Sequence, residues 1–168
     1  MSYAAEDRTA GHEWIAVAVS SDDRRGADSA DVSDTAAFTL EGGYDLLTTE
    51  HVRAGLEIGV VWSSHDARKL TGTDEDPRLY VTRWNLGGRL AFEFERVVLY
   101  GDGGVYVRSE SSDDEPTLEQ DGRGGYIGGG IDFWYEENAR LGPFVRAYDF
   151  ADSDLNELLI GISATFAF

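Results

Sequence analysis

The chain has 168 residues, of which 42% are hydrophobic, and its 32 acidic and 14 basic residues give a formal net charge of −18. This surplus of acid argues against nucleic-acid binding, which needs a basic patch to neutralise phosphates. Cysteine is absent, which excludes disulfides and thiolate metal sites. No run of about 18 apolar residues occurs, so no transmembrane helix is predicted.

The first half of the chain alternates apolar and polar residues with a period of two, which is typical of β-strands. The stretch EWIAVAVS is apolar on both faces, with Ile15, Val17 and Val19 as the expected outer set. The next stretches separate more clearly into apolar sets: Phe38, Leu40 and Tyr44; Val52, Ala54, Leu56, Ile58, Val60 and Trp62; Tyr80, Thr82, Trp84, Leu86, Gly88, Leu90 and Phe92.

The second half continues the alternation in four further stretches. Their apolar sets are Val97, Leu99, Val105 and Val107; Ile127, Ile131, Phe133 and Tyr135; Leu141, Pro143, Val145 and Ala147; Leu158, Ile160, Ile162, Ala164, Phe166 and Phe168. The chain therefore has eight predicted strands. We expect residues 12–168 to form a single all-β domain, preceded by a short extension over residues 1–11.

The connections between the predicted strands alternate in length. Residues 45–50, 94–96 and 136–139 are short turns that suit antiparallel neighbours. The other four connections are longer, and they contain 19 of the 32 acids and only 5 bases. These long segments are residues 20–35, 63–78, 109–122 and 149–157. Acidic charge is therefore predicted to gather at one end of the molecule.

The polar face of the predicted strands is unusual for a surface in water, because it holds glycine, serine, threonine, arginine and acid but no lysine. Its charged members are Glu41, Arg53, Glu57, Arg83, Arg89, Glu93, Asp102, Arg108, Asp132 and Arg146. Eight strands enclose an interior just wide enough for side chains. Small and charged residues fill such an interior provided that the charges pair, whereas the opposite face is too rich in aromatic residues to fit.

The apolar face must then meet an apolar surrounding, and lipid is the expected one. The outward positions from Val52 to Trp62 cover about 28 Å at a usual strand tilt, close to the apolar band of a transmembrane barrel. Aromatic residues near the strand ends suit the interfacial girdles of such barrels. The predicted girdle and lipid-facing residues are Tyr44, Trp62, Tyr80, Phe92, Tyr135, Phe166 and Phe168. The predicted fold is a closed antiparallel eight-stranded up-and-down transmembrane β-barrel.

Three stretches resemble the small eight-stranded outer-membrane barrels of the OmpA/OmpX type. They are GGYIGGGIDFWY, VRAYDFADSD and the terminal LLIGISATFAF. The resemblance implies a Gram-negative outer membrane, a removed signal peptide, short periplasmic turns and acidic extracellular loops. It also implies that the barrel-assembly machinery reads the C-terminal strand. No cofactor is implied.

The expected role is non-enzymatic: envelope integrity, surface interaction or adhesion by a monomer with a largely plugged interior. The expected partners are outer-membrane lipid, lipopolysaccharide and a surface partner outside the cell. Three alternatives stay open: a lipid-modifying enzyme, a small pore, and a soluble lipocalin-like barrel that binds an apolar ligand.

Three polar segments are candidates for chemical sites. His65 stands beside Ser63, Ser64 and Asp66, but adjacent residues in one extended segment seldom form a catalytic triad. No catalytic residue and no metal site is therefore predicted. The stretch 152–157 lacks the glycine of a calcium loop. Loose divalent-cation binding is considered only for an acidic group in one long connection: Asp113, Asp114, Glu115, Glu119 and Asp121.

Overall fold

Eight antiparallel strands close into a barrel in sequence order, with β1 paired to β8. The computed structural model describes residues 13–25, 32–66, 78–112, 122–150 and 156–168. The strands are β1 (Glu13–Arg25), β2 (Val32–Thr48), β3 (Val52–Asp66), β4 (Arg78–Phe94), β5 (Val97–Ser112), β6 (Gly122–Trp134), β7 (Ala139–Phe150) and β8 (Asn156–Ala167). The predicted fold class is confirmed. The proposed extension over residues 1–11 lies outside the described residues.

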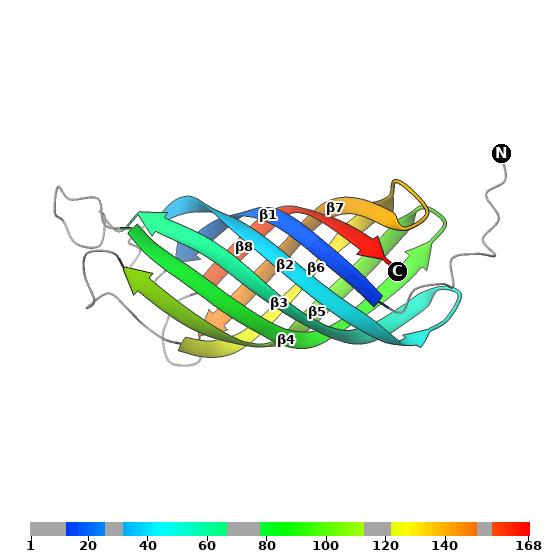
Figure 1. Cartoon of the computed structure of the whole chain (residues 1–168), viewed down its shortest axis with the longest axis horizontal. Helices are drawn as coiled ribbons and strands as arrows, with labels where there is room; N and C mark the ends of the chain where they lie inside the picture. Colours follow the sequence, from blue (N-terminus) through cyan, green and yellow to red (C-terminus); the bar gives the residue numbers. More distant parts are fainter. Residues whose placement is uncertain (1–12, 26–31, 67–77, 113–121, 151–155) are drawn as a thin grey trace.

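The three short turns and the end of β8 lie at the same end of the barrel, on the right in Figure 1. We call this the turn end and the opposite end the loop end. The turns occupy residues 49–51, 95–96 and 135–138 between the paired strands. Among the described residues, no helix is long and apolar enough to cross a membrane.

The strands extend further toward the loop end than the sequence pattern predicted. Residues 20–25 of β1, expected to begin a long connection, pair in continuous register with residues 156–161 of β8. The ladder continues because cross-strand hydrogen bonds join backbone groups and do not require apolar side chains. The hydrophobic pattern therefore marks only the apolar band on the outside of the barrel, and the paired strands continue past that band toward the loop end.

Alternation sorts the side chains into an outer and an inner set along every strand. In β3, Leu56 and Ile58 are exposed, whereas Arg53 and Glu57 are buried. One outward position departs from this pattern, because Val60 is only 6% exposed. Its cross-strand partners are Leu40 and Trp84, so larger outward side chains flank it. Side-chain size therefore modulates an exposure that strand parity otherwise sets.

Candidate functional site

The barrel interior collects the charged residues that the alternation pointed inward. Nine of the ten predicted interior charges are buried, and the tenth, Glu41, is half-buried. Together with four further acids and one further arginine, they form three groups of charged residues along the barrel axis. In a low-dielectric interior each charge needs a partner, because an unpaired buried charge is strongly unfavourable.

The group nearest the turn end centres on Arg53. Its Nε lies 3.0 Å from Glu93 Oε2, and its Nη1 lies 3.7 Å from Asp45 Oδ2. All three residues are buried. Asp45 stands at a register shift in β2, between Asp45 and Leu47. The shift follows Asp45, which keeps the inward parity of Glu41; the sequence pattern missed this partner because residues 45–50 were predicted to form a turn.

Asp132 joins two arginines in the same part of the interior. Its Oδ2 lies 3.2 Å from Arg140 Nε and 3.5 Å from Arg89 Nη2. The Arg89 guanidinium also stacks on two aromatic rings, 3.9 Å from the Tyr100 centroid and 4.7 Å from Trp14. Such cation–π contacts are favourable where the cation is removed from water. Arg89 is thus held by a carboxylate and two rings.

The middle group centres on Arg146. Its Nε and Nη2 donate to the two oxygens of Asp102 at 3.1 and 3.0 Å, and its Nη1 contacts Glu41. Glu57 accepts a hydrogen bond of 2.7 Å from the Tyr126 hydroxyl. A bidentate arginine–carboxylate pair fixes geometry as well as charge. This group therefore ties together residues from five strands.

The group nearest the loop end is formed by Arg83 and Arg108. Arg83 Nη2 lies 3.0 Å from Asp22 and also contacts Glu157. Arg108 lies 3.0 Å from Glu110 and 3.6 Å from Glu157. Three of these acids were predicted to lie in solvated loops. The structure corrects that prediction, because they stand on strand residues that continue the inward parity.

Five charged interior residues were missed by sequence reasoning: Asp22, Asp45, Arg140, Glu110 and Glu157. A signal was present for all five, because each lies an even number of residues from inward positions of the same strand. It was overlooked because the segments were read as connections once the apolar alternation ended.

Tyrosine rings fill much of the space between the ion pairs. Tyr106 and Tyr148 meet edge to face with ring centroids 5.1 Å apart, and Tyr126 packs against Tyr148 at 5.8 Å. Asn85 Nδ2 donates to the Tyr148 hydroxyl at 2.9 Å. A cavity in the middle of the barrel, beside Arg146, has a volume of about 10 Å³, close to the lower limit for one water molecule. The interior is thus packed rather than open.

Inward glycines make room for these side chains. A Cβ on Gly130 would lie 2.6 Å from the Tyr100 hydroxyl oxygen, and one on Gly59 would lie 2.7 Å from Glu41 Cγ. Both distances are far below ordinary contact, so a larger residue would force the neighbour to move. The abundance of glycine in the strands therefore reflects the fullness of the interior.

The outer wall is apolar and aromatic. All seven predicted girdle and lipid-facing residues are exposed, from 40% for Tyr80 to 82% for Tyr135. Phe38 and Trp62 stack on neighbouring strands with centroids 5.9 Å apart. So extensive an exposed apolar surface needs an apolar surrounding, which for a closed barrel is lipid.

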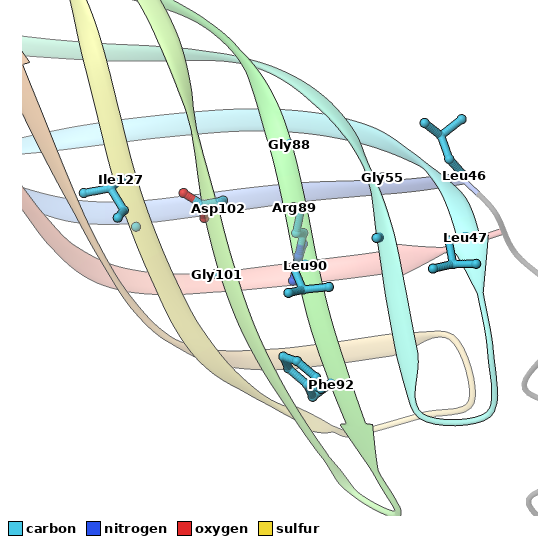
Figure 2. Close-up of a pocket in the computed structure, with 12 residues that line it drawn as sticks. Leu46, Leu47, Gly55, Gly88, Arg89, Leu90, Phe92, Gly101, Asp102 and Ile127 are labelled. Carbon is cyan, nitrogen blue, oxygen red and sulfur yellow. The ribbon is translucent and has the colours of Figure 1, made fainter.

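A groove interrupts this wall near the turn end, with a volume of about 710 Å³. Figure 2 shows Leu47 and Ile127 on opposite sides of it, with Leu90 and Phe92 between them. The outward glycines Gly88 and Gly101 expose the backbone of β4 and β5 in its floor. Because no outward side chain rises from these two positions, the wall is hollow there.

The predicted polar clusters are only partly described. Ser63 is buried inside the barrel, and its neighbour Ser64 is half-buried on the opposite face of β3. The side chains of His65 and Asp66 lie outside the described residues. So do the weak cation candidates Asp113, Asp114, Glu115, Glu119 and Asp121. Within the described part of the chain, no group of three or more acidic or histidine side chains is arranged to hold a metal ion.

A closed eight-stranded barrel with a charged, packed interior and an apolar exterior defines a membrane-spanning β-barrel protein. The family model of the outer membrane protein beta-barrel domain matches residues 1–168, and the chain belongs to this family. Its place is accordingly the outer membrane. No curated protein matches the chain in sequence.

Solved structures with the same fold are distant in sequence. Neisserial surface protein A superposes with a TM-score of 0.67 at 12% identity, covering 94% of this chain and 97% of the other. The attachment invasion locus protein Ail of Yersinia pestis gives 0.62 at 13% identity, covering 93% and 99%. The outer membrane enzyme PagL gives 0.55 at 13% identity, covering 92% and 99%. At these identities the likeness shows the fold alone.

Proposed function

We propose that this protein is a non-enzymatic, non-conducting barrel of the outer membrane that holds an acidic surface outside the cell. The observation that carries the proposal is the interior. Among the described residues, six arginines and nine carboxylates line it, and tyrosines fill the space between the groups. The cavity beside Arg146, of about 10 Å³, has no room for a hydrated solute.

The role at the surface follows from the distribution of charge. The four long segments contain 19 of the 32 acids in the sequence. Asp22, Glu110 and Glu157 are buried in the interior, and in the proposed orientation the other 16 face the exterior. Such a surface attracts basic partners and repels anionic lipopolysaccharide unless divalent cations bridge the two. One neighbour in fold is named for attachment and invasion, which agrees with a surface-interaction role.

Conductance in planar bilayers tests the plugged interior. The purified barrel, reconstituted in a planar bilayer, should give no stable current steps. Arg146→Ala, which removes a large side chain from the middle group, serves as the comparison and should raise leakage if it folds. Steady unitary currents from the wild-type protein would overturn the non-conducting part of the proposal.

Surface interaction is tested with protein in vesicles whose lipids carry no net charge. Vesicles containing the barrel should bind a polylysine-coated surface, and substitution of Asp113, Asp114 and Glu115 by Asn, Asn and Gln should weaken that binding. Equal binding by vesicles with the wild-type barrel and by vesicles with the substituted barrel would contradict the surface role. A lipid-hydrolysis assay of wild type and His65→Ala tests the non-enzymatic part of the proposal. Neither protein should hydrolyse lipid, and hydrolysis by the wild type that is lost in the variant would establish an enzyme.

A further inference from the structure

Gly88 and Gly101 form the floor of the groove in the outer wall, and close packing does not require glycine at either position. A Cβ on Gly88 would meet its nearest neighbour, Gly55 O, at 3.4 Å, and one on Gly101 would meet Gly128 O at 3.8 Å. Both are ordinary contacts, unlike the crowding around the inward glycines. Glycine inside a strand is unfavourable relative to residues with a side chain. The two glycines therefore keep the groove open without being required by the barrel itself.

The walls of the groove are continuous with the lipid-facing surface. Leu46, Leu47, Leu90, Phe92 and Ile127 line it, and all five are exposed by 44% or more. Its volume of about 710 Å³ falls within the usual range of ligand pockets. From Gly88 to Phe92 the floor runs about 13 Å along β4, which at a strand tilt near 40° spans about 10 Å of depth, about a third of a bilayer's hydrocarbon core.

Charged residues stand beyond the turn end of the groove. Phe92 pairs with Val52, and the preceding residue, His51, is exposed in the β2–β3 turn next to the exposed Glu50. The β4–β5 turn consists of the exposed residues Glu95 and Arg96. Each turn thus offers one acidic and one basic residue at the level where lipid headgroups lie.

We propose that the groove binds one acyl chain of a zwitterionic phospholipid from the leaflet next to the short turns. The chain lies over Gly88 and Gly101, the phosphate lies near Arg96 and His51, and the ammonium lies near Glu95 and Glu50. A zwitterionic headgroup matches the alternating charges of the two turns better than an anionic one. An acyl chain matches a groove whose side walls are leucine, isoleucine and phenylalanine.

Native mass spectrometry of the barrel released from detergent micelles tests the site. The probes are phosphatidylethanolamine and phosphatidylglycerol with identical palmitoyl and oleoyl chains. The wild type should retain one phosphatidylethanolamine, with phosphatidylglycerol retained several-fold less. Gly88→Leu and Gly101→Leu should each lower retention of phosphatidylethanolamine about tenfold, because a new side chain occupies the groove.

The matched control is Gly42→Leu. Gly42 is also an outward glycine, and its Cβ would meet Trp14 O at 3.6 Å, but it does not line the groove. This variant should retain lipid like the wild type. Glu95→Gln with Arg96→Gln should remove the preference between the two headgroups and keep the chain contact. Loss of binding in the control, or unchanged binding in both groove variants, would overturn the proposal.

The same spectra distinguish a second copy of the chain from lipid. A dimer that disappears in Gly101→Leu and persists in Gly42→Leu would identify the groove as a protein contact and would contradict the lipid site. Because the groove variants leave the interior untouched, their bilayer conductance should equal that of the wild type. The test of the lipid site is thereby separate from the test of the plugged interior.

Discussion

Arg146 on β7 holds both carboxylate oxygens of Asp102 on β5, through Nε and Nη2, at 3.1 and 3.0 Å. The two residues are 44 positions apart in the chain, and both are buried. β6 separates their strands in the sheet, so this pair bridges the interior across one strand and links neighbouring hairpins.

Replacing Arg146 by Met should strongly destabilise the barrel. The substitution keeps the apolar volume but leaves Glu41, Glu57 and Asp102 without the guanidinium that contacts two of them. Removing one partner of a buried ion pair costs about 3–5 kcal/mol. Urea unfolding in detergent, followed by the gel-mobility shift on heating, measures the loss.

The control for this substitution is Arg96→Met in the exposed β4–β5 turn. Exposed substitutions away from special features usually change stability by less than about 0.5 kcal/mol. If both variants unfold at the same urea concentration as the wild type, the interior ion pairs contribute nothing measurable.

Leu56→Arg should impair insertion into the membrane, because Leu56 is 57% exposed on the lipid-facing wall. An arginine facing the middle of the bilayer costs about 2–4 kcal/mol, and the cost falls to about 0–1 kcal/mol near the interface. Ser109→Arg, an outward position near the loop end of β5, is therefore the matched control. Refolding yield into lipid vesicles gives the measurement, and equal yields for the two variants would refute the lipid-facing assignment.

Glu57→Gln, one residue from Leu56, should leave insertion intact. Gln retains a carbonyl oxygen that can accept the hydrogen bond from the Tyr126 hydroxyl, which Glu57 accepts at 2.7 Å. The substitution also removes one negative charge from a group with three carboxylates. We expect a refolding yield within twofold of the wild type. A yield as low as that of Leu56→Arg would mean that Glu57 does not face the interior.

Two glycine substitutions should have opposite effects. Gly130→Ala places a Cβ 2.6 Å from both Pro143 O and the Tyr100 hydroxyl, and such overpacking costs about 1–3 kcal/mol. Gly101→Ala points outward, where its Cβ meets Gly128 O at an ordinary 3.8 Å, and it should be neutral or stabilising by about 0.4–1 kcal/mol because it restricts the unfolded chain. The midpoints of thermal unfolding in the same detergent should rank Gly101→Ala at or above wild type and Gly130→Ala below it.

Asp22→Asn should destabilise the barrel by an amount that salt does not change. Asp22 and its partner Arg83 are fully buried, with Oδ2 and Nη2 3.0 Å apart. Dissolved ions screen exposed charges over about 10 Å at 0.1 M but screen buried pairs much less. Urea unfolding of wild type and variant at low and at molar salt provides the comparison. A difference that vanishes at high salt would place this pair in contact with water.

Much of the architecture could be predicted because strand parity is a local property. Alternation alone assigned Arg53 and Glu57 to one face and Leu56 to the other, and the aromatic excess on the second face decided which one meets lipid. The ends of the strands could not be read in the same way. Beyond the apolar band, polar residues such as Asp22 still pair through their backbone groups, so the hydrophobic signal stops before the ladder does.

The sequence by itself determined the number of strands, the face of each recognised residue and the apolar exterior, since each depends on neighbours two positions away. Only the tertiary structure decided which charges meet. Arg146 contacts Glu41, 105 positions away, because barrel closure and strand register bring β7 and β2 to the same depth. The groove over Gly88 and Gly101 arises in the same way, because residues of five strands, β2 to β6, line it.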